Sequence, residues 1–249
     1  MKSKINYLNH SGFTLETPQV LYVFDLYTDP AGILASYTNC GKPVVFFVSH
    51  SHYDHWNSGI LSFTNTVPNL YIIDNSCRSS EIDEACKAGG HRLIYVDPYM
   101  SFAKDELQIE GLNSIHTFGS TDEGVSFLLD TEIGRIYHAG DLNEWDWQDE
   151  DTESVKAAYR HELGLIKDAL SGDELIVAFV PVDQRLGETA FSGVKTLLEY
   201  VLPRYIIPMH LNGGDDLPGK LRRELRSELQ FDGTHVVSMT LAGMPFDLQ

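Results

Sequence analysis

The chain is poor in basic residues. It has 18 Lys and Arg against 36 Asp and Glu, so its formal net charge at pH 7 is −18. Proteins that bind nucleic acids take much of their affinity from Lys and Arg that contact phosphates. This balance argues against nucleic acid as a partner. The basic cluster Lys220, Arg222, Arg223 and Arg226 is interleaved with Glu224 and Glu228, the pattern of a solvent-exposed helix face.

Cysteine is scarce as well, and long apolar runs are missing. Cys40, Cys77 and Cys86 form an odd set without Cys-x-x-Cys spacing, so we expect reduced thiols and no disulfide framework. No stretch approaches the roughly 20 apolar residues of a membrane helix, and the first ten residues lack the apolar core of a signal peptide. We therefore expect a cytoplasmic protein that does not contact a membrane.

Short apolar segments alternate with turn residues along the chain, and we detect no repeat or linker. We expect one domain over residues 1–249, with two β-sheets packed face to face and helices outside. The expected strands are 5–9, 13–17, 21–24, 44–48, 71–74, 92–96, 106–111, 114–116, 125–129, 135–138, 175–180, 205–207 and 235–239. The expected helical segments are 56–64, 79–87, 154–170, 188–201 and 218–229.

The most informative segment is His50-Ser51-His52-Tyr53-Asp54-His55, which follows the apolar strand Val44–Val48. Imidazole and carboxylate groups suit zinc and its neighbours better than magnesium or calcium. His50 and His52 lie two residues apart and share a face if the chain stays extended. Asp54 and His55 then lie on the other side of the turn. This arrangement favours two adjacent metal ions.

Three further candidates follow apolar segments in the same way, at the ends of expected strands. They are His116, Asp141 and His210. With the hexapeptide they give five histidines and two aspartates, enough for two divalent ions with positions left for water. No serine or cysteine nucleophile motif is evident, so the pattern predicts hydrolysis without a covalent intermediate.

The His-x-His-x-Asp-His pattern, with the later His, Asp and His, resembles the metallo-β-lactamase superfamily over nearly the whole chain. The resemblance implies an α/β (α+β) fold, a four-layer αββα sandwich of two mixed β-sheets. It implies a first-metal set of His50, His52 and His116, a second-metal set of Asp54, His55 and His210, and Asp141 as the bridge. Zinc is expected, with manganese as the alternative.

Within this superfamily the chain is most similar to the L-ascorbate-6-phosphate lactonase-like branch. Segments 9–13, 119–124, 179–183 and 205–210 carry that similarity. Asn9-His10-Ser11 departs from the Gly-His of many relatives, and the acidic and aromatic run Asn143–Glu153 has no family counterpart.

For several residues near the expected metal site, the sequence allows two roles. Asp25 either supports the metal ligands or forms a turn. His10 and His138 either face the site or are structural residues. Trp145 and Trp147 either line the site mouth or lead into the following helix.

The pattern predicts a dinuclear zinc hydrolase that acts on a small molecule, such as a lactone, another cyclic ester or a phosphodiester, through a hydroxide held between the two ions. Asp54 is the candidate base, and His210 a candidate proton donor to the leaving group. The alternatives are a nuclease resembling ribonuclease Z and a metal-binding sensor without turnover. The oligomeric state, including a homo-oligomer, is left open.

Overall fold

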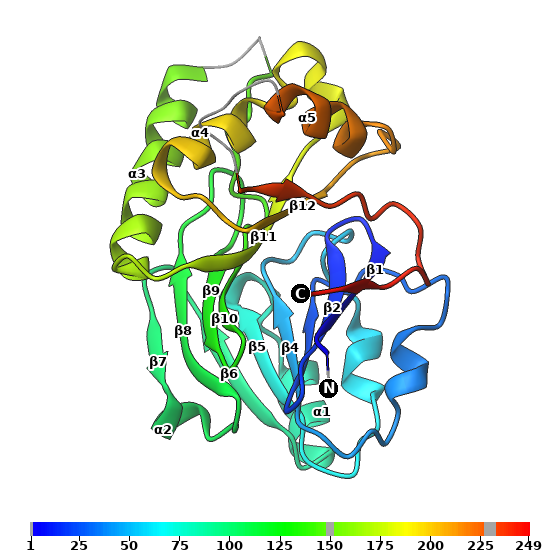
Figure 1. Cartoon of the computed structure of the whole chain (residues 1–249). Coiled ribbons are helices and arrows are strands. Elements are labelled where there is room, and N and C mark those ends of the chain that lie inside the picture. Colours follow the sequence, from blue (N-terminus) through cyan, green and yellow to red (C-terminus); the bar gives the residue numbers. More distant parts are fainter. Residues whose placement is uncertain (1, 148–151, 227–232) are drawn as a thin grey trace.

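Two mixed β-sheets form the centre of the protein, as the computed structural model shows for residues 2–147, 152–226 and 233–249 (Figure 1). The first sheet has the order β14-β1-β2-β3-β4-β5-β6 and the second the order β13-β12-β11-β10-β9-β8-β7. The first comprises β14 (Phe246–Asp247), β1 (Lys4–Asn9), β2 (Gly12–Glu16), β3 (Leu21–Phe24), β4 (Val44–Val48), β5 (Leu70–Asp74) and β6 (Arg92–Val96).

The second sheet repeats this plan. It comprises β13 (His235–Val236), β12 (Tyr205–Met209), β11 (Leu175–Pro181), β10 (Gly134–His138), β9 (Ser126–Thr131), β8 (Leu112–Phe118) and β7 (Ser101–Ala103). In each sheet one half is antiparallel and the other parallel. The parallel strands are β3 to β6 in the first sheet and β10 to β13 in the second.

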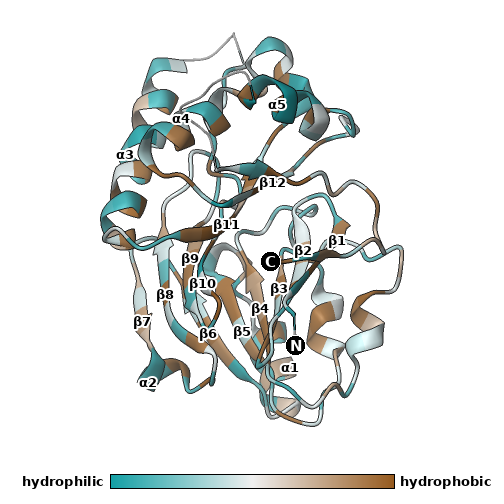
Figure 2. Cartoon of the chain, in the orientation of Figure 1, coloured by the Kyte–Doolittle hydropathy of each residue, from teal (hydrophilic) through white to brown (hydrophobic). Residues whose placement is uncertain are grey.

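The helices lie on the outside of the two sheets (Figure 1). They are α1 (Ser80–Ala88), α2 (Lys104–Leu107), α3 (Thr152–Leu170), α4 (Ser192–Tyr200) and α5 (Leu217–Leu225). In Figure 2 the helices carry both hydrophilic and hydrophobic residues, whereas central strands such as β4 and β5 are mainly hydrophobic. The helices are amphipathic, as expected for elements that cover a sheet with one face. Among the described helices, none combines the length and the apolar character that a membrane span needs.

The burial of β4 explains why its sequence, Val44–Val48, is a continuous apolar run. Val45 and Phe47 pack between the sheets, whereas Val44, Phe46 and Val48 pack on the opposite face. Both faces are therefore buried, which is usual for parallel strands.

Most expected elements are confirmed, and the following expectations need correction. Residues 106–111, expected as a strand, contain the end of α2 and a loop in which Gln108 has φ 53°. The Glu106 carboxylate accepts a hydrogen bond from the Ala103 amide and favours the helical turn. The expected helix 188–201 starts later, at Ser192, after a 3₁₀ segment over Gln184–Thr189. The expected helix 218–229 ends at Leu225, and its residues 227–229 lie outside the described part.

Candidate metal centre

The polar groups singled out in the sequence gather where parallel strands of both sheets end. His50 follows β4, Asp141 follows β10, and His210 follows β12. The carboxyl ends of parallel strands are a common place for ligand sites, because the loops that leave them converge there. Asp54 and His55 join this group from the turn after His52, whose carbonyl accepts a hydrogen bond from the His55 amide.

Asp141 lies in the middle of the centre, and its two carboxylate oxygens face different histidines. Oδ1 is 3.1 Å from Nε2 of His55 and 3.5 Å from Nε2 of His210. Oδ2 is 3.5 Å from Nε2 of His50. The side chain is buried at the end of a short turn. In that turn Gly140 has φ +54°, and a Cβ there would lie 2.7 Å from the Val125 carbonyl.

His55 and His50 are oriented by hydrogen bonds to Asp25 and Ser49. Asp25 is fully buried and accepts hydrogen bonds from His55 Nδ1 at 2.8 Å and from the Ser49 hydroxyl at 2.7 Å. Since that hydroxyl donates to Asp25, its oxygen accepts from His50 Nδ1 at 2.8 Å. Both imidazoles thereby turn Nε2 towards Asp141. Of the two readings of Asp25, the contact with the histidine is the one that the structure shows.

A third carboxylate holds His210 in the same manner. Asp183, two residues beyond β11, accepts a hydrogen bond from His210 Nδ1 at 3.0 Å and one from the side-chain Nδ2 of Asn212 at 2.7 Å. Arg185 donates to both oxygens of Asp183. We did not single out Asp183 from the sequence, although it follows a strand like the other site residues.

His52 lies at the outer edge of the centre. Its Nδ1 is 3.0 Å from His50 Nε2, and its Nε2 is 3.0 Å from a Glu123 carboxylate oxygen. The loop between β8 and β9 also brings Asp122 there. His52, Asp122 and Asp141 offer ligand atoms that all lie within 4.8 Å of one another. Asp122 is exposed, so this side of the centre is open to solvent.

His116, expected as a first-metal ligand, lies away from this cluster. It sits inside β8 opposite Ser101 and Leu128, and its Nδ1 is 2.9 Å from the Ser101 hydroxyl. The expectation assumed that the strand ends at His116, but β8 continues to Phe118. The loop that reaches the centre therefore starts beyond His116 and presents Asp122 instead.

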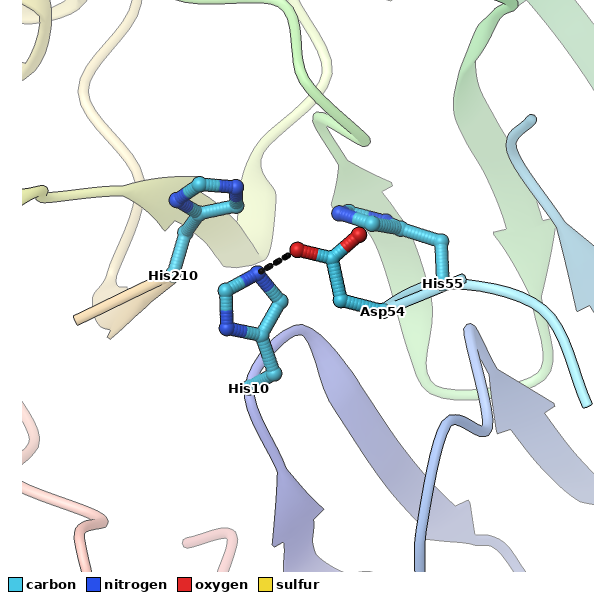
Figure 3. A group of neighbouring side chains, drawn as sticks. All are labelled: His10, Asp54, His55 and His210. Atoms are coloured by element: carbon cyan, nitrogen blue, oxygen red, sulfur yellow. Dashed lines mark ion pairs between the residues drawn. The ribbon is translucent and has the colours of Figure 1, made fainter. Parts of the chain in front are cut away.

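His10, for which the sequence allows either a site-facing or a structural role, faces the centre. It lies in the turn between β1 and β2, and its Nε2 is 3.3 Å from Asp54 Oδ2. Figure 3 shows its ring and the ring of His210 directed towards the Asp54 carboxylate. His10, Asp54, His55 and His210 form a second group whose ligand atoms lie within 4.8 Å of one another. By contrast, His138 is a structural residue of the core: its Nε2 donates to the Ser11 carbonyl at 3.0 Å, and its Nδ1 accepts from the Gly140 amide at 3.2 Å.

Charges in the centre are strongly coupled. Burial disfavours a charge on His55, but the carboxylates of Asp141 and Asp25 outweigh it and raise its pKa to about 10. Burial also opposes a charge on His210, yet Asp141 and Asp183 raise its pKa to about 9. Imidazole binds metal ions in its neutral form, so an ion bound here would displace these protons.

His50 and His10 behave in the opposite way. Burial, helped by the neighbouring His55, lowers the pKa of His50 to about 4. Burial, helped by His210 and His55, lowers the pKa of His10 to about 4. Both rings are therefore neutral at pH 7, the form in which imidazole donates a lone pair.

The donor set fits divalent metal ions. Nε2 of His55, Nε2 of His10 and Oδ1 of Asp141 are buried, and none of them makes a contact with hydrogen-bond geometry among the described residues. Their nearest charged contacts are the 3.1 Å approach of His55 Nε2 to Asp141 Oδ1 and the 3.3 Å approach of His10 Nε2 to Asp54 Oδ2. Buried polar atoms are normally paired, and an unpaired one calls for an explanation. Imidazoles and carboxylates that converge on a shared space, each oriented by an outer hydrogen bond, are the usual surroundings of a metal ion.

Aromatic rings cover one side of the centre. Trp145 is buried, its indole lies 5.5 Å from the His210 ring, and its Nε1 donates to the Asp141 carbonyl. Trp147 stacks on Trp145, and the Arg185 guanidinium lies over Trp147 at 5.1 Å. Trp145 therefore lies beside the centre, with Trp147 stacked on it. Residues 148–151 of the run Asn143–Glu153 lie outside the described part.

Comparison with solved structures identifies the fold of the chain. No family model and no curated protein sequence matches the chain. The metallo hydrolase Igni18 from Ignicoccus hospitalis is 17% identical over 100% of both chains, with a TM-score of 0.65. The metallo-β-lactamase fold protein YhfI from Bacillus subtilis is 11% identical over 99% of this chain and 100% of its own, with a TM-score of 0.60.

Human tRNase Z, short form, is 10% identical over 99% of each chain, with a TM-score of 0.57. At these identities the likeness establishes the fold and leaves the activity open. The two mixed seven-stranded sheets with flanking helices are the metallo-β-lactamase fold, as the sequence resemblance implied. Of these neighbours, Igni18 is described as a metallo hydrolase and YhfI as a metallo-β-lactamase fold protein.

Proposed function

We propose that this protein is a metal-dependent hydrolase of a small molecule and that its centre holds two divalent ions. The observation that carries the proposal is the position of Asp141. One oxygen of this carboxylate faces His55 and His210, and the other faces His50. A carboxylate whose two oxygens serve two histidine groups is suited to bridge two ions.

The geometry supports two ligand groups that share Asp141. We assign His52 and Asp122 to the first group, because their ligand atoms lie within 4.8 Å of one another and of Asp141, and Asp122 takes the place expected for His116. We add His50 to this group, because its Nε2 is 3.5 Å from Asp141 Oδ2 and 3.0 Å from His52 Nδ1. The second contains Asp54, His55 and His210. Imidazole-rich sites favour zinc, and additional carboxylates widen the choice towards manganese. Zinc is therefore the first candidate, and manganese in the carboxylate-containing first group is the alternative.

When bound, such ions supply a Lewis acid and a water of lowered pKa. The residues of the chain position the reacting groups. Asp54 keeps 23% of its side chain exposed, so one of its oxygens can reach a water that approaches the centre. In this proposal Asp54 orients that water and takes its proton as the general base.

His210 has a more restricted part. Its Nδ1 is held by Asp183, so only Nε2 is directed into the centre. A ring nitrogen cannot coordinate an ion and donate a proton at the same time. Coordination by His210 and proton donation to the leaving group are therefore exclusive, and the nearness of Asp141 supports coordination.

Arg185 suggests what else the substrate carries. Its guanidinium is half exposed beside the centre, where it pairs with Asp183 and covers Trp147. A planar guanidinium recognises carboxylate and phosphate groups well. The substrate we propose is a small lactone, cyclic ester or phosphodiester with one or two negative groups.

The test combines metal content with turnover. Wild-type protein loaded with zinc or manganese should approach two ions per chain and hydrolyse at least one member of a panel of aryl lactones and chromogenic phosphodiesters. Asp54→Asn keeps the shape and one acceptor oxygen but removes the base. Its turnover should fall by about 10²–10⁴-fold.

Asp141→Asn is the matched variant for the bridge and should reduce the metal content to one ion or fewer. Near-normal turnover of Asp54→Asn would contradict the assigned base. Two firmly bound ions in Asp141→Asn would contradict the bridge. A wild-type protein that binds two ions but hydrolyses none of the lactones and phosphodiesters in the panel would favour the alternative function, a metal-binding sensor without turnover.

A further inference from the structure

We infer that His10 is an additional ligand of the metal centre, contributed by the β1–β2 hairpin. This inference rests on the proposed function, because it concerns the same ions. In the structure the Nε2 of His10 shares a space with Asp54, His55 and His210, with all four ligand atoms within 4.8 Å of one another. The rings of His10 and His210 have centroids only 4.1 Å apart (Figure 3).

The ring of His10 has a buried nitrogen that the protein does not satisfy. Its Nε2 has no hydrogen-bond partner among the described residues. The 3.3 Å approach to Asp54 Oδ2 is close, but it does not have hydrogen-bond geometry. A buried imidazole nitrogen without a partner is unfavourable, because it has lost its water. A shared metal ion would satisfy this atom and Asp54 together.

The backbone of His10 is held in place at some conformational cost. His10 has φ 53°, a left-handed conformation that residues other than glycine rarely adopt. Its amide donates to the Tyr7 hydroxyl at 2.8 Å, and its carbonyl accepts from the His210 amide at 3.2 Å. The fixed turn thus aims the imidazole at the centre, and strain of this kind is typical of functional positions.

The hairpin turn itself is closely packed against a support of the centre. At Gly12 a Cβ would lie 2.9 Å from the carbonyl oxygens of both Asn9 and Asp25. The turn that carries His10 is therefore fixed relative to Asp25, which orients His55. A ligand on this hairpin would connect the first sheet to the end of β12 in the second.

The added imidazole changes the character of the second ligand group. Three histidines and Asp54 make four protein donors before Asp141 is counted, and four is the number found in closed zinc sites. The first group, with the exposed Asp122, stays more open. We expect the ion in the His10 group to be the more tightly held of the two and to be a transition metal.

The experiment uses the full chain and cobalt(II) as the probe, because the visible absorption of bound cobalt reports its ligands. His10→Asn is the main variant, since asparagine tolerates the left-handed conformation better than most residues. His10→Gly relieves the turn entirely and checks that the hairpin still folds. His116→Asn is the matched control, because this histidine lies in β8 away from the centre.

Removal of an outer residue that only orients a ligand costs about 10–100-fold in metal affinity. If His10 is a ligand, both His10 variants should lose more than 100-fold affinity for one cobalt ion in a chelator competition. The cobalt spectrum should change as well, while His116→Asn binds like the wild type.

A loss below 100-fold with an unchanged cobalt spectrum would overturn the inference and make His10 a positioning residue. In that case a wild type that binds two ions leaves the proposed function intact. Failure of the wild type to bind cobalt would overturn the proposed function, and the inference with it.

Discussion

At the scale of single residues, three histidines of the centre share one arrangement. Each has its Nδ1 held by a buried oxygen and its Nε2 turned inward. The partners are Asp25 for His55, Ser49 for His50 and Asp183 for His210. Such a bond fixes both the tautomer and the orientation of the ring, so the lone pair of Nε2 points where an ion can lie.

Asp25 allows a direct test of this arrangement. Asp25→Asn keeps the acceptor for the Ser49 amide but places an amide group where His55 Nδ1 donates. The carboxylate no longer orients and polarises the ring, so we expect metal affinity to fall by about 10–100-fold. Competition with a chromogenic chelator measures this loss.

The matched control for that variant is Asp29→Asn. Asp29 accepts hydrogen bonds from the amides of Ile33 and Leu34 and is not among the groups that offer metal ligands. It should lose stability but bind metal like the wild type. Unchanged metal affinity in Asp25→Asn would return Asp25 to a turn-forming role.

The limits of sequence reasoning at this scale are clear from two residues. Asp54 could be placed because its spacing from His52 and His55 is short and local. His10 could not, because its approach to Asp54 depends on a hairpin 44 positions earlier in the chain, which only the packing of β1 and β2 decides. A local sequence pattern such as the one around Asp54 does not indicate which distant turn packs against it.

At the scale of elements, the site depends on where strands end. Apolar runs located β4, β10 and β12 well, so His50, Asp141 and His210 were found at their ends. The run before His116 predicts a strand that ends at His116, whereas β8 continues to Phe118. Thr117 and Phe118, which still belong to β8, pair with Phe127 and Ser126. A strand end set by pairing with a neighbour is poorly marked in the sequence of one strand alone, and Asp122 was missed for that reason.

Gly124 tests how the β8–β9 loop is attached to the centre. It has φ +76°, and a Cβ there would lie 2.0 Å from the Ser49 carbonyl and 2.5 Å from the His50 Cβ. Gly124→Ala must therefore displace the loop, with Asp122, or the backbone of Ser49 and His50. We expect weaker binding of the ion in the first ligand group, together with a lower melting temperature.

Gly172→Ala is the control that separates the strain of a left-handed backbone from the clash of the added Cβ with its neighbours. Gly172 has φ +89°, but nothing lies within 4 Å of its Cβ position. Its substitution should lower the free energy of unfolding only by the left-handed strain, about 1–2 kcal/mol. For a protein of this size each kcal/mol lowers the melting temperature by roughly 2–4 °C. Calorimetry and metal titration compare the two variants. Equal melting temperatures and equal metal affinity would contradict the tight approach at Gly124.

At the scale of the whole molecule, charge bears on the choice between a small substrate and a nucleic acid. Three of the basic residues that could form a local patch are paired with carboxylates. Arg204 pairs with Glu174, Arg185 with Asp183 and Lys220 with Asp216, each at 2.6 Å. Together with the net charge of −18, this leaves little positive potential to attract a polyanion.

The fold alone is compatible with a nuclease, since human tRNase Z, short form, shares it. Binding of a tRNA precursor at about 50 mM salt decides the question, because phosphate contacts are strongest at low salt. We expect no tight, salt-sensitive binding and no site-specific cleavage by the metal-loaded protein. The human tRNase Z serves as the positive control under the same conditions.

Tight binding that weakens steeply with salt, together with cleavage at one site, would show that a local surface outweighs the global charge. Arg185→Ala and Arg204→Ala would then locate that surface, since each removes one guanidinium that the structure places on a carboxylate.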